Sequence, residues 1–174
     1  MSGVVVVTGG RDFTDGWAIA LALGLVALRV EITALRHGAA AGADTRAAAW
    51  ATRHRIDVAP WPANWALGPQ AGPLRNIEML AGEPRPVLVV AFPGGNGTAH
   101  CVGQARKMGL PVWFPCDNQA IVPECMVDVV EAHVEKSGML CCEMAPPDAS
   151  PAWRPIPEEC RQADYRALEA LQEG

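Results

Sequence analysis

Lysine is scarce in this sequence, and that scarcity limits the kind of partner the protein can bind. Only Lys107 and Lys136 are lysines among 174 residues, and the formal net charge is -5. These values argue against a broad basic surface for nucleic acid or for an anionic membrane. Any contact with an anion must therefore come from arginine side chains or from backbone N–H groups.

Long apolar runs and targeting signals are also missing. The longest run, residues 17–30, is shorter than the roughly 20 residues that cross a bilayer, and it contains Gly24 and Arg29. The start of the chain, Met1-Ser2-Gly3 followed by four valines, lacks the basic region and cleavage site of a signal peptide. We therefore expect a cytoplasmic protein without membrane contact.

The six cysteines include no Cys-x-x-Cys pair, and their spacing fits no common zinc pattern. Reduced, mostly buried thiols are the default expectation. A zinc site built from Cys125, His133 and the adjacent Cys141 and Cys142 is the alternative. We expect no bound metal and no cofactor.

Half of the residues are hydrophobic, so a chain of this length can bury a substantial core. Strand and helix patterns alternate through about residue 115, which predicts an α/β fold with a doubly wound, mostly parallel sheet of five or more strands. The predicted domain covers residues 1–116. Residues 117–174 form a predicted C-terminal extension with a Pro-rich segment at 146–157 and a terminal helix at 157–171. The pattern of residues 126–134 suits a helix, although its valines also allow a strand.

The local patterns also predict element boundaries. The predicted strands are residues 3–8, 32–36, 56–59, 87–91 and 111–114. The predicted helices are residues 16–30, 45–54, 74–82 and 98–108, the first capped by Thr14 or Asp15. Residues 60–73, with four prolines, are predicted to form a long loop.

Three glycine-containing turns, at residues 9–12, 38–44 and 93–98, follow predicted strands. Ligands of doubly wound sheets bind outside the carboxyl ends of the strands, where the strand order reverses. We therefore expect the three turns to meet at one crevice. Glycines let the backbone approach a ligand, and a helix start offers unpaired N–H groups to an anion. The alternative is a set of tight turns that bind nothing.

No standard nucleotide motif is complete in these turns. The turns at residues 9–12 and 93–98 both lack the lysine and hydroxyl that close a P-loop. The dinucleotide motif GxGxxG is also incomplete, because His100 occupies the position of its third glycine. Arg11 and Arg75 are candidate phosphate or carboxylate partners because a guanidinium offers a bidentate fork, although Arg11 also suits a surface turn.

Other polar residues near the turns have two interpretations each. Asp44 and Thr98 suit either capping of their own helices or contact with a ligand. Trp65 suits packing or stacking on a base. His100 and Cys101 suggest a nucleophile pair, but adjacent helix residues point in different directions.

Four segments together resemble the SLOG superfamily, and specifically its YspA-type, cpYpsA-related branch: residues 7–13, 37–45, 71–76 with Met79, and 91–99. This branch is often found in bacterial and phage genomes. The resemblance implies a Rossmann-like domain that binds nucleotides or nucleotide-derived ligands, commonly as a homodimer.

Distant relatives in the superfamily are the LOG-type phosphoribohydrolases, which cut the N-glycosidic bond of nucleoside monophosphates. Their signature is PGGxGTxxE, with an arginine in a preceding RKxxM helix. Arg75 and Met79 match that helix and Asn76 replaces its lysine, but Cys101 stands at the glutamate position. A mostly neutral thiol of pKa about 8.5 is a poor substitute for that glutamate.

The leading hypothesis is a sensing or carrier protein that binds a nucleotide or a nucleotide-derived phosphorylated ligand. The predicted ligand-binding residues are Gly9, Gly10, Arg11, Asp12, Gly38, Gly42, Asp44, Arg75, Asn76, Met79, Pro93, Gly94, Gly95, Asn96, Gly97 and Thr98. The alternative is a phosphoribohydrolase-like enzyme with Arg75, Asp44 and Glu78 as catalytic candidates and Asp12 as a further carboxylate. A third hypothesis, single-stranded DNA binding as in the DNA-processing relatives, is disfavoured by the acidic charge.

Overall fold

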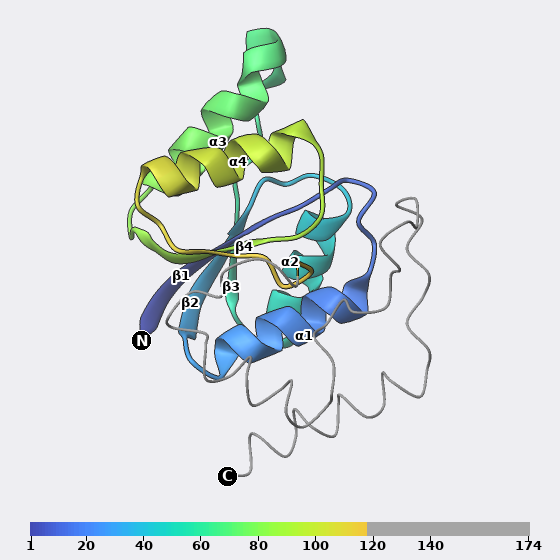
Figure 1. The fold of residues 1–174 in the computed structure, drawn as a ribbon, viewed down its shortest axis with the longest axis vertical. Helices are drawn as coiled ribbons and strands as arrows, with labels where there is room; N and C mark the ends of the chain where they lie inside the picture. Colours follow the sequence, from blue (N-terminus) through green and yellow to red (C-terminus); the bar gives the residue numbers. More distant parts are fainter. Residues whose placement is uncertain (118–174) are drawn as a thin grey trace.

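Five parallel strands form the centre of the domain that a computed structural model describes over residues 1–117 (Figure 1). The elements are β1 (Ser2–Thr8), α1 (Gly16–Ala27), β2 (Glu31–His37), α2 (Ala43–Arg53), β3 (Asp57–Pro60), the 3-10 helix η1 (Trp65–Gln70), α3 (Ala71–Ala81), β4 (Pro86–Ala91), α4 (Asn96–Lys107) and β5 (Val112–Trp113). Four predicted features lie outside the described residues: the alternative zinc site, the segment 126–134, the Pro-rich segment and the terminal helix.

The strand order is β3-β2-β1-β4-β5, and every neighbouring pair is parallel. The chain thus builds outward from β1 to β3 and then returns to place β4 on the other side of β1. The predicted α/β, doubly wound, five-stranded sheet is confirmed. Its strand order reverses between β1 and β4, which is where ligands bind in sheets of this type.

The sheet is buried on both faces, and this explains the run of valines in β1. Val5 and Val7 belong to the larger core cluster, with side chains of α1 and α2, whereas Val6 belongs to the second cluster, with side chains of α3 and α4. Figure 1 shows these two helix pairs on opposite faces of the sheet. Alternate strand residues point to opposite faces, so both sets must be apolar here.

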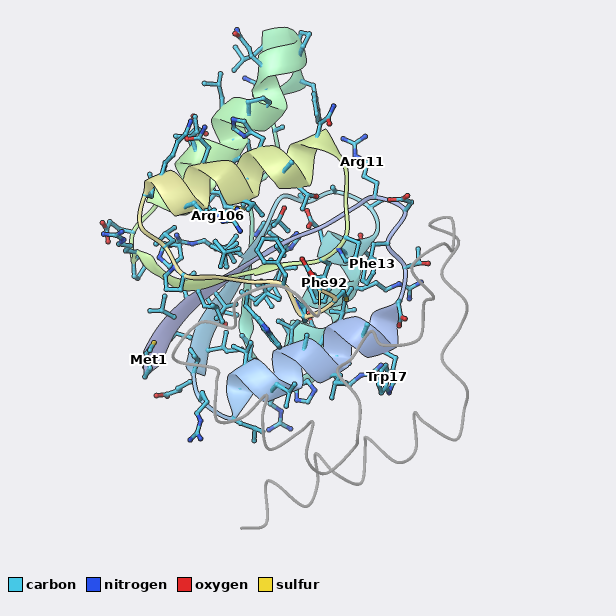
Figure 2. All side chains as sticks on the ribbon, viewed as in Figure 1. Met1, Arg11, Phe13, Trp17, Phe92 and Arg106 are labelled. Carbon is cyan, nitrogen blue, oxygen red and sulfur yellow. The ribbon has the colours of Figure 1, made fainter. Side chains whose placement is uncertain are left out.

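The turns after β1 and β4 carry two aromatic rings into the larger core cluster. Phe13 and Phe92 stack with ring centroids 5.4 Å apart, and Figure 2 shows them together between the sheet and α1. Aromatic pairs of this kind add about 0.5–1.5 kcal/mol to the burial of their surface. Their packing anchors the first and third glycine turns to the same part of the core.

The prediction of a loop over residues 60–73 is wrong for its second half. Residues 65–70 form η1, and α3 begins at Ala71 rather than Leu74. The Asn64 side chain accepts a hydrogen bond from Ala66 N at 3.2 Å, and Gly68, with a φ of 71°, kinks η1 in its interior. Pro73 is tolerated because the N–H groups of a first helical turn need no intrahelical acceptor.

Two helix starts also differ from the prediction because glycines occupy their N-cap positions. Gly42 precedes α2 and Gly95 precedes α4, so each helix begins two residues earlier than predicted. Thr98 therefore lies inside the first turn of α4 and does not cap it. In contrast, Asp15 caps α1 as expected, accepting from Trp17 N at 3.1 Å and Ala18 N at 3.0 Å.

Across residues 1–117, each helix is too short or too polar to cross a bilayer.

Gly94→Ala is expected to lower the free energy of unfolding by about 1–3 kcal/mol, because added atoms in a closed contact force the backbone apart. A Cβ at this position would lie 2.6 Å from Gly10 N. The matched control is Gly103→Ala within α4, where a Cβ meets no described atom within 4 Å and the helix should gain up to about 1 kcal/mol. Urea denaturation of both variants measures the difference, and equal stabilities would contradict the close contact.

Candidate functional site

A cavity of about 460 Å³ lies at the carboxyl ends of β1 and β2 and at the start of α4. Residues from all three glycine turns line it, so the structure brings together Arg11 and Asn96, which are 85 positions apart in the sequence. Figure 2 shows Arg11 at the end of the domain where α4 begins. The turns therefore meet at one crevice, at the reversal of strand order.

Most of the predicted ligand-binding residues line this cavity. They are Gly9, Gly10, Arg11, Gly38, Asp44, Arg75, Asn76, Met79, Gly95, Asn96, Gly97 and Thr98. Asp12, Gly42, Pro93, Gly94 and the catalytic candidate Glu78 do not.

The predicted residues that lie off the cavity include three that hold the turns in place. The carbonyl of Pro93 accepts a hydrogen bond from Gly10 N at 2.8 Å. Gly42 has a φ of 75° and lies against the carbonyls of Gly10 and Arg11, which leaves no room for a side chain. Gly94 packs in the same way against Gly10. Glu78 is exposed on α3.

The sequence patterns missed part of the cavity lining. The additional residues are Val7, Thr8, Ala40, Pro69, Gly72 and Pro73. Gly72, Asn76 and Met79 share one face of α3, because residues at i, i+4 and i+7 lie above one another on a helix. That spacing was visible in the sequence, but the predicted helix began at Leu74 and left Gly72 in a loop.

The start of α4 is open toward an anion. No side chain within residues 1–117 caps this helix, and its first turn carries no acidic residue. Gly95 and Gly97 line the cavity, yet a Cβ on either one would meet no described atom within 4 Å. An uncapped helix N-terminus carries partial positive charge and free N–H donors. This turn can therefore accept a phosphate or carboxylate group.

Arg75 and Asn76 connect α3 to two of the glycine turns. Arg75 Nη1 donates to the carbonyls of Gly38 and, at 2.9 Å, of Trp61, while Nε donates to Asn76 Oδ1 at 3.0 Å. Asn76 Nδ2 in turn donates to the carbonyl of Gly97 at 3.1 Å. Burial lowers the pKa of the Arg75 guanidinium, and the charge of Asp44 opposes that shift. The pair is thus held rigidly against the cavity.

Asp44 is a buried carboxylate in the cavity wall, with only 4% of its surface exposed. It does not cap its own helix, because its Oδ2 accepts from Ala40 N at 3.1 Å in the preceding turn. Burial raises the pKa of Asp44, and the hydrogen bond from Ala40 and the charge of His37 partly offset this rise. A raised pKa favours the protonated acid, which is the form that donates a proton.

His37 lies behind the wall and holds the turn after β2. Its Nδ1 accepts from Ala39 N at 3.1 Å, and the side chain is buried with Nε2 lacking a hydrogen-bond partner in the described part of the chain. Burial lowers the pKa of His37, although the charge of Asp44 acts in the opposite direction. The imidazole is therefore kept neutral.

The structure bears on the open interpretations of Trp65 and Cys101. Trp65 is 61% exposed and lines the cavity, with the Arg11 guanidinium 5.8 Å from its ring centroid, so much of its ring surface is available for stacking. Cys101 is fully buried in the second core cluster and does not line the cavity. Burial raises the pKa of its thiol to about 11, so Cys101 stays protonated and is not an available nucleophile. Its neighbour His100 does line the cavity.

Comparison with known proteins finds a matching family model, a similar sequence and a similar solved structure. The model of the family described as "YspA, cpYpsA-related SLOG family" matches residues 3–68. The Gene 61 protein of Mycobacterium phage D29 is 40% identical over 126 residues, which cover 62% of this chain and 92% of the phage protein. The X-ray structure of TM1055, a Northeast Structural Genomics Consortium target, superimposes with a TM-score of 0.48 at 19% identity, covering 64% of this chain and 72% of that chain.

The neutral His37 predicts a loss of stability in mild acid. Its pKa in the folded state lies below the ordinary value of about 6.5, so the unfolded chain binds the proton first as the pH falls. We expect the free energy of unfolding to decrease as the pH falls through about 6.5, with a slope of up to about 1.4 kcal/mol per pH unit from this group.

His37→Asn keeps an acceptor for Ala39 N but cannot titrate, so its unfolding free energy should depend less on pH. The pKa of Asp44 is raised, so in both the wild type and the variant Asp44 contributes a slope of opposite sign to the pH dependence of the unfolding free energy. Urea unfolding between about pH 7.5 and about pH 5 measures the difference between the two slopes. Identical slopes would contradict a buried neutral imidazole.

Proposed function

Because this chain belongs to the YspA, cpYpsA-related SLOG family, we propose that its cavity binds a nucleotide or a nucleotide-derived phosphorylated ligand. The observation that carries this proposal is the uncapped, glycine-lined start of α4 inside a cavity at the reversal of strand order. The cavity volume of about 460 Å³ falls in the range of roughly 300–1,000 Å³ that is usual for small-molecule sites.

The phosphate group of the ligand is placed at the first turn of α4. The N–H groups of residues 96–98 point out of the helix end, and the Thr98 side chain adds a hydroxyl donor in the cavity wall. The guanidinium of Arg11 is exposed at the same cavity and can reach an anionic oxygen with two N–H groups. Together these donors give this part of the cavity a positive potential in a protein whose net charge is -5.

We propose that the sugar lies beside Arg75 and Asn76 in the same cavity. Both side chains are fixed by their hydrogen bonds to backbone carbonyls, so they need little ordering when a ligand arrives. Asp44 faces the same space and can accept or donate a hydrogen bond to a ribose hydroxyl.

A sensing or carrier role follows from the chemistry at the position of the LOG-type glutamate. The protonated thiol of Cys101 lies outside the cavity and supplies neither a general acid nor a nucleophile to a bound ligand. Binding without turnover is what such a site supports. We further propose a cytoplasmic homodimer, with the exposed Leu67, Leu74 and Ile77 of η1 and α3 as the apolar surface for the second copy.

The phosphate position is tested with Gly95→Asp and Gly95→Asn. Either side chain can cap α4 and accept from the same N–H groups, but only aspartate repels a phosphate. We expect mononucleotides, cyclic nucleotides or nucleotide sugars to raise the Tm of the wild type. Gly95→Asp should bind at least about tenfold more weakly than Gly95→Asn.

Thermal shift against that nucleotide panel, followed by calorimetry on the best ligand, measures both effects. If no member of the panel raises the Tm of the wild type, the proposed function fails. Equal affinities of the two variants would contradict a phosphate position at the start of α4.

A second candidate function, hydrolysis of the N-glycosidic bond of a nucleoside monophosphate, is favoured by one observation. Of the carboxylates considered from the sequence, Asp44 lines the cavity, whereas Asp12 and Glu78 do not. Burial raises the pKa of Asp44, which suits a general acid that protonates a leaving base.

Release of free base from nucleoside monophosphates tests this candidate. If the protein is a hydrolase, Asp44→Asn should reduce base release by about 100-fold or more, the usual contribution of a general acid. Glu78→Gln, on the exposed face of α3, is the matched control and should keep full activity. No release of base from any common nucleotide by the wild type would remove the candidate.

A further inference from the structure

A second, smaller cavity of about 220 Å³ adjoins the first. The two share five lining residues, which are Arg11, Gly38, Ala40, Trp65 and Arg75. Ala39, Ala41, Pro62 and Ala63 line only the smaller one. The second cavity is below the roughly 300 Å³ of a complete small-molecule site, so it suits one group of a ligand that begins in the first.

The second cavity is lined by small uncharged residues, the Trp65 ring and two arginines, Arg11 and Arg75. Small uncharged side chains form most of the lining, and no carboxylate contributes within residues 1–117. Trp65 offers an indole ring that is 61% exposed, with Arg11 placed over it. Exposed aromatic surface beside a guanidinium is a stacking platform for a flat ring.

Two backbone donors of this cavity, in the turn at residues 38–41, are already engaged. Ala39 N donates to His37 Nδ1 and Ala40 N donates to Asp44 Oδ2, both at 3.1 Å. Arg75 Nη1 is likewise engaged by the carbonyls of Gly38 and Trp61. The turn at residues 38–41 therefore differs from the start of α4, where no side chain caps the helix. A second phosphate would find fewer free donors here than at α4.

We propose that the second cavity is the subsite for the nucleobase of the bound nucleotide, with the base stacked on Trp65. This inference rests on the proposed function, because it requires a phosphate at the start of α4. The ligand extends past Arg11 and Trp65, which border both cavities, and its base lies against Trp65, Pro62 and Ala63. Trp65 and Ala63 are then specificity-determining residues for a ligand that carries a base.

The test compares nucleoside 5′-monophosphates with ribose 5-phosphate, which has the same phosphate and sugar but no base. Ala63→Leu fills the second cavity and does not touch the first. We expect it to weaken the best nucleoside monophosphate by about tenfold or more, the loss of one stacked base, and to leave ribose 5-phosphate within about twofold. Ala41→Leu repeats the test at another position that lines only this cavity.

Trp65 supplies a graded control. Trp65→Phe keeps a ring for stacking and should retain most of the nucleotide affinity, whereas Trp65→Ala should lose about tenfold. Calorimetry gives the dissociation constants, and the Tm of each variant reports whether it folds.

Two outcomes separate this inference from the function on which it rests. If the wild type binds both compounds and Ala63→Leu and Ala41→Leu leave the nucleotide affinity unchanged, or weaken both compounds equally, the base subsite is overturned and the phosphate site stands. If the wild type binds neither compound, the proposed function fails and the subsite fails with it.

Discussion

The close backbone contact between the turns after β1 and β4 is the constraint on which the site depends. Gly10 N donates to Pro93 O, and Phe92 N donates to Thr8 O, both at 2.8 Å. A side chain on Gly94 would enter this contact, so the two turns can approach only if that position is glycine. Because the contact joins the two strands at the reversal of strand order, it places the first turn of α4 beside the Arg11 turn and opens the cavity between them.

The turn before α2 and the start of α4 use their backbone donors differently, although neither helix has a side-chain cap within residues 1–117. Before α2, the N–H groups of Ala39 and Ala40 are engaged by His37 and Asp44. Before α4, Gly95 leaves the helix uncapped. Unengaged donors attract an anion, whereas engaged donors leave mainly the surfaces of alanine, proline and tryptophan side chains. One part of the site is therefore suited to charge and the other to a flat apolar group.

Burial, rather than surface charge, sets the protonation states of the ionisable groups around the cavity. Asp44 and His37 are both buried, and burial shifts their pKa values in opposite directions, each toward the neutral form. Cys101 is neutral for the same reason. Arginine therefore carries the permanent positive charge at the cavity, at Arg11 and Arg75, in a protein whose net charge is -5.

The sequence by itself determined the layered α/β fold and the grouping of the glycine turns, because valine runs, glycine positions and strand–helix alternation are local signals that parallel sheets obey. It did not determine η1, the exposure of Trp65, the burial of Asp44 and His37, or the second cavity. Those features depend on contacts between distant segments, such as Arg75 with Gly38 and Arg11 with Trp65. Only the tertiary structure decided them, since no local pattern reports which side chains meet once the sheet has folded.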